Sequence, residues 1–342
     1  MLARKTTGVL IIFIVLLVVS VCVVWYLTST DRSKPTATVQ KITIAQAGDF
    51  FLYAPLYVAS DAGLFSKNGL EVRLISTGGD EKTWAAVISG DAQFGVADPT
   101  FVAISATRGQ PGRVIASIVN GVPFWGITFE GSMQPIKNPT ELNNYTVGTF
   151  PSPSTAYTLQ KRMFTEAGLE PRIREGAFGT MLAMLKAKQV DIALELEPNV
   201  SQAVAQGAHV VYSLADRYGD FAITGLTTTP ALIDREPEFV RAVSCSIQQA
   251  LGFIRVEPNR TLEILQRRFP EIDSAIAKSA LDRVVQANII PETVVISRDA
   301  WKKAIDLRVE VGDISTPSRY EQFIYDVDAK WAANTCQYKS GK

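Results

Sequence analysis

Two stretches of this sequence share one order of structural signals. Residues 84–99 read WAAVISGDAQFGVADP, and residues 182–198 read LAMLKAKQVDIALELEP. In each stretch an apolar helical face is followed by a turn, a short apolar strand, an acidic residue and a proline. This order is typical of α/β folds, in which buried strands alternate with helices. The echo predicts two lobes built on one plan, although the same order can arise by chance in any α/β protein.

The chain up to residue 214 continues this alternation of short apolar strands and helices. Residues 54–64 predict a helix that stops at Gly63, and Asp80 is the predicted N-cap of a helix at 80–89. Beyond residue 226 only helical periodicity remains. We therefore expect two α/β lobes and a helical C-terminal tail that packs against the first lobe.

The composition is that of a globular protein without an excess of either charge. Of 342 residues, 47% are hydrophobic and 20% are charged, and Lys plus Arg equals Asp plus Glu at 34 each. A chain of this length suits two lobes or a domain with a deep cleft. A nucleic-acid-binding protein normally carries a basic excess, so the balance argues against that class of partner.

The N-terminal residues differ from the rest of the chain. Arg4 and Lys5 precede an apolar run at residues 8–27. Twenty helical residues span about 30 Å, the thickness of a bilayer core, and the preceding basic residues favour a cytoplasmic N-terminus. We expect residues 1–34 to be a cytoplasmic stub, a transmembrane anchor and a linker, with the rest of the chain outside the cytoplasm. A cleaved signal peptide and lipidation at Cys22 are the alternatives.

Cysteine and histidine are too sparse for a metal or catalytic site. Cys245 and Cys336 form either a disulfide in an oxidising compartment or two separate buried thiols, and the sequence leaves both open. His209 is the only histidine, and no CxxC motif occurs. A zinc site or a histidine-dependent hydrolase is therefore not expected, and we predict no cofactor and no catalytic residues.

Residues 53–72, YAPLYVASDAGLFSKNGLEV, carry a resemblance to a known family. This run, together with residues 90–98, GDAQFGVAD, resembles ABC-transporter substrate-binding proteins of the sulfonate, taurine, nitrate and thiamine-pyrimidine-precursor (NMT1-like) family. Asn138-Pro-Thr-Glu-Leu and Val147-Gly resemble the start of that family's second lobe. The motif is specific for the family and weak for the ligand.

The resemblance implies a type II periplasmic-binding-protein fold that closes about a hinge. It places lobe 1 at residues 41–128 plus 225–342 and lobe 2 at 131–222, with crossovers near 126–131 and 219–227. It also implies partnership with an importer's permease and ATPase. We expect a monomer on the periplasmic face of the inner membrane or the outer surface.

Ligands bind an open α/β sheet at the carboxyl ends of its strands, where the helices begin. The residues that follow the predicted strands are therefore the candidate ligand-binding residues. In the first lobe they are Asp49, Phe50, Phe51, Tyr53, Gly78, Gly79, Asp98, Thr100, Phe124 and Trp125. In the second lobe and at the second crossover they are Phe150, Ser152, Ser154, Thr155, Glu197 and Asp220.

Each candidate has a structural alternative. Asp98 can simply cap a helix, and Ser152 and Ser154 can either cap one or, with free N–H groups, bind an anion. The aromatic candidates are either core residues or a surface for a flat ring or a cation.

The candidates are acidic and aromatic, and Arg and Lys are absent from these strand-end stretches. Such a pocket favours an aminated or heteroaromatic ligand, such as a pyrimidine-type vitamin precursor, whereas a dianion would gain from Arg. A sulfonate or taurine-type anion is the alternative ligand, and a ligand-sensing domain for a membrane signalling partner is the alternative function. Relatives that make the thiamine pyrimidine resemble this chain in fold but carry a cysteine-rich motif and a reactive histidine, so we do not expect an enzyme.

Overall fold

The strands of the protein form two five-stranded sheets. The computed structural model describes Ser20 and residues 39–152, 154–177 and 179–340. The first sheet has the order β2-β1-β3-β10-β4 and the second β7-β6-β8-β5-β9. The strands are β1 (Gln40–Gln46), β2 (Leu70–Ser76), β3 (Phe94–Ala97), β4 (Arg113–Asn120), β5 (Trp125–Thr128), β6 (Val147–Thr149), β7 (Ile173–Glu175), β8 (Ile192–Glu195), β9 (His209–Ser213) and β10 (Ala222–Thr228).

Both sheets follow the same plan. In the first, β1 pairs in parallel with β2 and β3, and β10 lies antiparallel between β3 and β4. In the second, β6 pairs in parallel with β7 and β8, and β5 lies antiparallel between β8 and β9. Each antiparallel strand is the first strand that the chain forms after it arrives from the other sheet. The predicted common plan of two lobes is therefore present in the structure.

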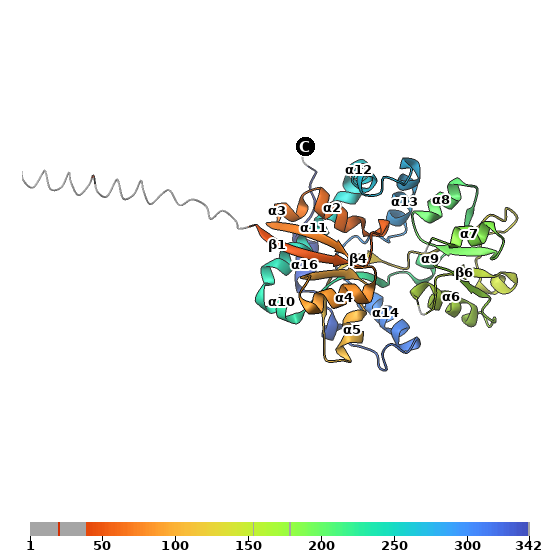
Figure 1. Ribbon diagram of the computed structural model, residues 1–342, viewed down its shortest axis with the longest axis horizontal. Coiled ribbons are helices and arrows are strands. Elements are labelled where there is room, and N and C mark those ends of the chain that lie inside the picture. Colours follow the sequence, from red (N-terminus) through yellow and green to blue (C-terminus); the bar gives the residue numbers. More distant parts are fainter. Residues whose placement is uncertain (1–19, 21–38, 153, 178, 341–342) are drawn as a thin grey trace, which may run out of the picture. The chain divides into compact units, whose positions relative to one another are not determined.

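Helices cover both faces of each sheet (Figure 1). In lobe 1, α2, α3 and α11 lie on one side and α4 and α5 on the other; in lobe 2, α7 and α8 lie opposite α6. The helices of the two lobes are η1 (Phe51–Tyr53), α2 (Ala54–Asp61), α3 (Leu64–Lys67), α4 (Asp80–Ser89), α5 (Phe101–Ala106), η2 (Pro139–Asn144), α6 (Thr155–Glu166), α7 (Met181–Lys186), α8 (Asn199–Ala205) and α9 (Leu214–Tyr218).

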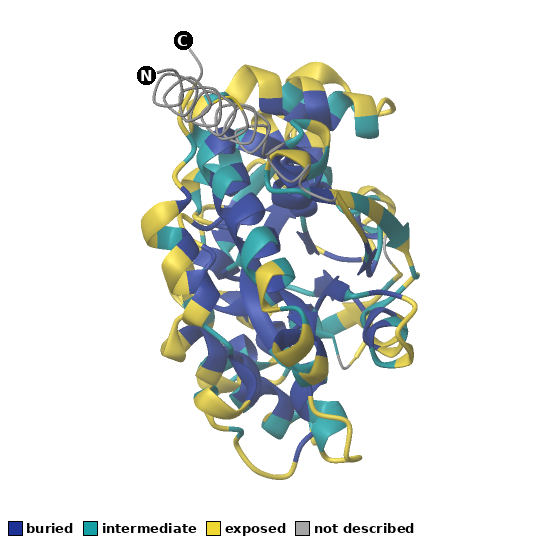
Figure 2. Cartoon of the chain, turned by 90° about the vertical axis from the view of Figure 1, so that its left-hand side faces the viewer, coloured by how far each residue is buried: buried dark blue, intermediate teal, exposed yellow. Residues whose placement is uncertain are grey.

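The helix α2 is apolar on every side from Ala54 to Ala59, and this part lies inside lobe 1. Its residues from Ala54 to Ala59 are all buried, and α11 packs against it. A helix that is hydrophobic all round has to be covered on all sides. The first part of the motif, residues 53–59, therefore lies in the core of lobe 1, and Figure 2 shows such buried segments in dark blue beneath exposed helix faces.

The tail is helical as predicted. It consists of α10 (Pro230–Arg235), α11 (Pro237–Val256), α12 (Pro258–Arg268), α13 (Ser274–Gln286), α14 (Arg298–Glu310), α15 (Tyr320–Phe323) and α16 (Val327–Thr335). Most of it packs on lobe 1, where α11 and α16 contact β4. However, α13 also contacts α8 of lobe 2, which the sequence did not predict.

The first crossover lies earlier than the sequence predicted. The strand β5 begins at Trp125 and belongs to the second sheet, so the chain leaves lobe 1 at 121–124 instead of near 126–131. Trp125 itself is buried and pairs with Glu195 and Ser213 of the neighbouring strands. The sequence of a strand does not show which of two sheets the strand joins. The position of the first crossover was therefore predicted too late in the chain.

The predicted membrane anchor at residues 8–27 lies outside the described residues, apart from Ser20. Within the part of the chain that the structure describes, no helix is both long enough and apolar enough to cross a bilayer.

A disulfide ties the end of the tail to α11. Cys245 on α11 and Cys336 directly after α16 are bonded, with Cα atoms 5.3 Å apart. The bond settles the alternative that the sequence left open, and such bonds persist in oxidising compartments outside the cytoplasm. It closes a loop of 91 positions, which restricts the unfolded chain.

We expect Cys245→Ser to lower the free energy of unfolding of the full-length protein in detergent by about 2–4 kcal/mol, because the unfolded chain regains this freedom. Urea unfolding followed by circular dichroism measures the change. A reductant should lower the parent's midpoint to that of the variant and leave the variant unchanged. Equal midpoints for parent and variant in oxidising buffer would contradict the prediction.

Candidate functional site

Two cavities lie between the lobes where the carboxyl ends of the strands meet. The aromatic cavity, about 230 Å³, is lined by Phe50, Leu52, Tyr53, Asp80, Asp98, Val119, Pro123, Phe124, Phe150, Ser154, Thr155, Ala156, Leu196, Ile223, Thr224 and Arg308. The acidic cavity, about 470 Å³, is lined by Asp49, Phe50, Phe51, Gly179, Leu196, Glu197, Pro198, Asn199, Gln202, Phe269, Glu271, Ile272, Asp273 and Ile276. Phe50 and Leu196 line both, so the cavities adjoin.

Aromatic rings from both sides wall the aromatic cavity. Phe50 and Tyr53, around the first turn after β1, lie edge to face with ring centroids 5.4 Å apart. Phe124 in the first crossover and Phe150 after β6 form a second pair at 5.8 Å. Burial raises the pKa of the Tyr53 hydroxyl well above its usual value, so this residue is neutral in the cavity. Such ring faces suit a flat aromatic ligand.

An ion pair closes one side of the aromatic cavity. One oxygen of Asp98 accepts hydrogen bonds from the backbone N–H and hydroxyl of Thr100, at 2.8 and 2.6 Å. The other oxygen pairs with Arg308 of α14. Arg308 also donates to the Thr100 hydroxyl at 3.0 Å and to Asp313 at 3.1 Å. The strand-end stretches that the sequence singled out do not supply this cation; it comes from the tail, and it is already paired.

Asp80 does not cap its helix as the sequence predicted. Gly79 occupies the N-cap position of α4, and Asp80 turns its carboxylate toward the end of β3. There its Oδ1 accepts the backbone N–H of Asp98 at 3.0 Å. Burial, and secondly the Asp98 carboxylate, raise the pKa of Asp80 to about 6.

The N-terminus of α6 opens on the aromatic cavity. The hydroxyl of Ser154 accepts the N–H of Tyr157 at 3.2 Å and so caps the helix. Thr155 and Ala156, in the first turn, also line the cavity. Because the first N–H groups of a helix have no partner within it, this end can hold a negatively charged group.

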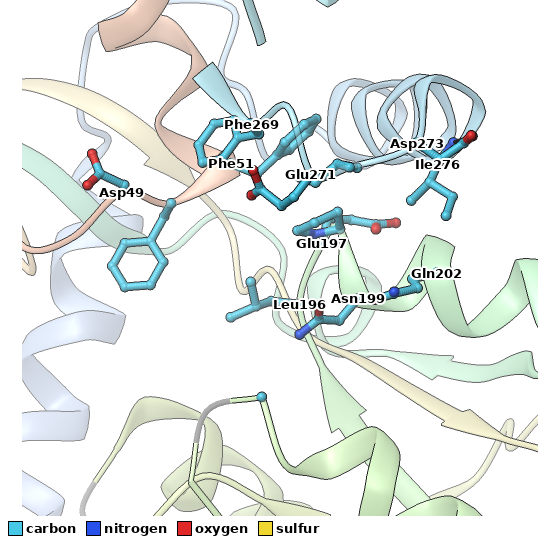
Figure 3. Close-up of a pocket in the computed structure, with 14 residues that line it drawn as sticks. Asp49, Phe51, Leu196, Glu197, Asn199, Gln202, Phe269, Glu271, Asp273 and Ile276 are labelled. Carbon is cyan, nitrogen blue, oxygen red and sulfur yellow. Dashed lines mark hydrogen bonds between the residues drawn. The ribbon is translucent and has the colours of Figure 1, made fainter. Parts of the chain in front are cut away.

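The acidic cavity carries carboxylates from both lobes and the tail (Figure 3). Asp49 accepts hydrogen bonds from Gln46 at 2.6 Å and Ser76 at 3.0 Å. Glu197 lies between Asn199 of α8 and Ile276 of α13 in the close-up. Its two oxygens accept hydrogen bonds from the N–H and hydroxyl of Ser201.

Glu197 also joins the two lobes. Arg283 of α13 donates to its Oε1 at 2.6 Å, although α13 belongs to the tail that packs on lobe 1. The Glu197 side chain is fully buried, and burial raises its pKa. A second ion pair, between Arg162 of α6 and Glu310 of α14, also links lobe 2 to the tail.

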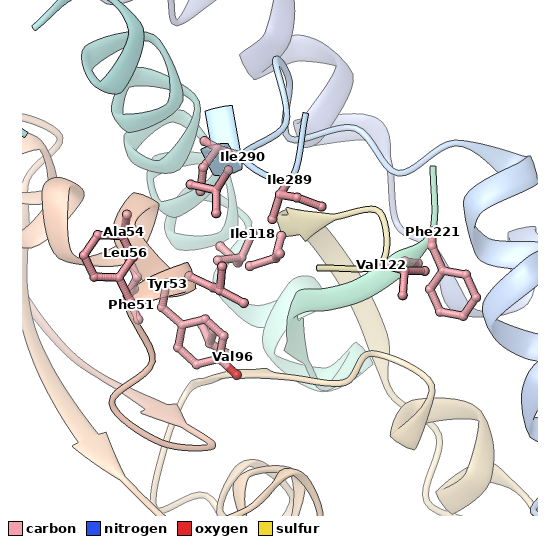
Figure 4. Close-up of a cluster of buried hydrophobic side chains, with 14 of the residues drawn as sticks. Phe51, Tyr53, Ala54, Leu56, Val96, Ile118, Val122, Phe221, Ile289 and Ile290 are labelled. Carbon is pink, nitrogen blue, oxygen red and sulfur yellow. The ribbon is translucent and has the colours of Figure 1, made fainter. Parts of the chain in front are cut away.

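The two crossovers between the lobes are hydrogen-bonded to each other. The N–H of Gly121 donates to the carbonyl of Phe221 at 3.0 Å, and Asn120 bonds both Phe221 and Asp220. Figure 4 shows Val122 and Phe221 close together beyond a buried cluster that includes Ile118 and Ile289. Asp220 is thus an exposed residue of the second crossover that lines neither cavity.

The structure brings most of the predicted site residues to the cleft. Those that line the aromatic cavity are Phe50, Tyr53, Asp98, Phe124, Phe150, Ser154 and Thr155. Those that line the acidic cavity are Asp49, Phe50, Phe51 and Glu197. Those that line neither are Gly78, Gly79, Thr100, Trp125, Ser152 and Asp220.

Sequence reasoning missed four charged residues that line the cavities, Asp80, Arg308, Glu271 and Asp273. It also missed Arg283, which lines neither cavity but pairs with Glu197. Arg308 and Arg283 lie on tail helices far from any strand end, where no local pattern marks them. Asp80 was predicted only as a helix cap. The Gly-Gly turn directly before it is a signal that its carboxylate can instead face a ligand. Among the described residues, no group of three or more His, Cys, Asp or Glu side chains is placed to hold a metal ion.

Known proteins with this fold bind solutes. The aliphatic sulphonate binding protein SsuA of Escherichia coli superposes with a TM-score of 0.68 at 17% identity, covering 89% of this chain and 94% of that one. A ligand-binding component of an ABC-type import system from Staphylococcus aureus gives 0.66 at 16% identity, covering 86% and 99%. The riboflavin-binding protein RibY of Chloroflexus aurantiacus is 25% identical over 281 residues, which are 77% of this chain and 78% of that protein.

The fold and the cleft thus match those of known solute-binding proteins of ABC importers. Residues 51–261, more than half of the chain, match the family described as NMT1/THI5 like, and the chain belongs to this family.

The Glu197–Arg283 pair yields a test of how the lobes are held. We expect Arg283→Gln to lower the free energy of unfolding by about 1–3 kcal/mol, because a fully buried carboxylate loses its charged partner. Urea unfolding of the full-length protein in detergent measures this change.

Lys278→Gln is the matched control. Lys278 lies on the same helix in an exposed pair with Asp282, and its loss should cost under about 0.5 kcal/mol. The additional change Glu197→Gln should restore part of the stability lost in Arg283→Gln. Equal losses for the two single variants would show that the pair across the lobes contributes nothing specific.

Proposed function

We propose that this protein binds a heteroaromatic or aminated organic ligand in the cleft, with the ring in the aromatic cavity, and delivers it to an ABC importer. The observation that carries the proposal is the pair of aromatic walls. Phe50 and Tyr53 face the cavity from lobe 1, and Phe124 and Phe150 face it from the first crossover and lobe 2. Closure of the lobes would hold a flat ring between these faces.

The charges of the cavity also favour this ligand class. Arg308 is the cation at the cavity, and its guanidinium is held by Asp98, Asp313 and Thr100. An anion would have to compete with two carboxylates for it. Similarity to a riboflavin-binding protein supports a ring ligand as well.

The dimensions support a ring with substituents. A cavity of about 230 Å³ holds one ring system, and the adjoining acidic cavity of about 470 Å³ offers room for polar groups attached to it. The boundary at Phe50 and Leu196 would then contact the ligand at the point where ring and substituent join.

A sulfonate or taurine-type anion is the second candidate ligand. The specific observation in its favour is the N-terminus of α6 at Thr155 and Ala156, which is suited to a negative group. The fold is also that of a sulphonate-binding protein.

The partners and location follow the same class. We propose that an importer's permease and ATPase receive the ligand, and that the apolar run at residues 8–27 anchors the protein at the outer face of the membrane.

We expect isothermal titration of the full-length protein in detergent to show binding of riboflavin or cytosine and no binding of ethanesulfonate. Phe50→Ala should weaken the ring ligand about tenfold, because one wall of the cavity is lost. Phe129→Ala is the control, since Phe129 is a half-buried aromatic residue outside the cleft. Tight binding of ethanesulfonate, with no response to riboflavin or cytosine, would favour the anion instead.

A further inference from the structure

Three charged side chains line the aromatic cavity: Asp80, Asp98 and Arg308. Two of them are occupied by protein groups. Both oxygens of Asp98 are used, one by Thr100 and the other by Arg308. Arg308 uses Nε, Nη1 and Nη2 for Thr100, Asp313 and Asp98. A ligand would have to break this network to reach either residue.

Asp80 is different because only half of its carboxylate is used. Oδ1 accepts the N–H of Asp98, whereas no described residue makes a hydrogen bond to Oδ2. The first turn of α4 brings this group to the cavity, and the preceding glycines Gly78 and Gly79 hold backbone angles, φ 84° and 157°, that other residues rarely adopt. In the aromatic cavity the structure therefore leaves one charged acceptor, Oδ2 of Asp80, open to the ligand.

We propose that Asp80 is the specificity-determining residue of the cleft and that it accepts a hydrogen bond from a nitrogen-bound hydrogen of the ligand. The inference rests on the proposed function and names the ligand class more closely. The ligand would be a ring that carries an amino group or a ring N–H. A molecule of the same shape without this hydrogen would leave Oδ2 of Asp80 without a partner in the closed cleft, which is costly.

The surroundings of Asp80 tune its charge. The groups that face it are the Asp98 carboxylate after β3, Arg308 on α14 and the Tyr53 hydroxyl on η1, while Glu81 and Lys82 follow it on α4. Burial and Asp98 raise its pKa to about 6, and the Asp98 N–H and Arg308 oppose this rise. The acceptor is thus ionised at pH 7.5 and becomes protonated as the pH falls through about 6, so affinity for a neutral N–H donor should fall in the same range.

The experiment uses pairs of probes that differ at the nitrogen. Riboflavin and 3-methylriboflavin differ by the ring N–H, and 1-methylcytosine and 1-methyl-2-pyrimidinone differ by the amino group and have no ring N–H. Titration of the full-length protein at pH 7.5 should show at least one N–H probe binding about ten- to a hundredfold more tightly than its partner. Asp80→Asn should reduce that difference severalfold or more.

The matched control is Glu81→Gln, which makes the same change of charge at the next, exposed residue of α4 and should leave all affinities unchanged. Affinity of the parent for the N–H probe should also fall about tenfold from pH 7.5 to 5, and this dependence should be absent in Asp80→Asn. If Asp80→Asn fails to fold, the paired probes and the pH series on the parent protein still test the role of Asp80.

The outcomes separate this inference from the proposed function. One outcome is that the ring probes bind with affinities that do not change when the N–H is removed, when the pH falls or in Asp80→Asn. In that case the proposed role of Asp80 is contradicted and the proposed ring ligand is retained. If none of the four ring probes binds the parent, both are wrong. If ethanesulfonate binds and the rings do not, the cleft serves an anion and Asp80 does not select its ligand.

Discussion

The ion pair between Asp98 and Arg308 joins the end of β3 to a tail helix 210 positions further along the chain. Burying two charges is favourable only when both are fully hydrogen-bonded, and here Thr100 and Asp313 complete the set. The pair fixes α14 against lobe 1 and thereby fixes one side of the cleft. It also removes the cation at the cavity from competition for a ligand, so the character of the site depends on it.

Lobe 1, lobe 2 and the helical tail together form the cleft. This explains which of its residues could be predicted from the sequence. The residues after β1 and β3 were found because strand ends and helix starts leave local patterns. The predicted residues of this kind that line the cavities are Asp49, Phe50, Tyr53 and Asp98. The family motif at residues 53–72 likewise marks a helix that is buried from Ala54 to Ala59.

Other features depend on contacts between distant segments and have no local pattern. Arg308 and Arg283 lie on amphipathic helices whose charged faces look like ordinary solvated faces until the tail is folded onto the lobes. Trp125 was predicted to be a ligand-binding residue because it follows a predicted strand. It is buried instead, because β5 joins the second sheet. Asp80 fitted an N-cap by type, and only the approach of β3 shows that its carboxylate faces the cavity.

The placement of β10 has a consequence for the order in which the protein can be completed during synthesis. Residues 125–213 contain every strand of the second sheet, so lobe 2 can pair all its strands as soon as that segment has emerged. The first sheet has to wait, because the strand between β3 and β4 is made after the whole of lobe 2. Until then β3 and β4 each expose an unpaired edge, which is a hazard for aggregation. The N-terminal lobe is therefore the last to close, and the nascent chain needs protection at these two edges.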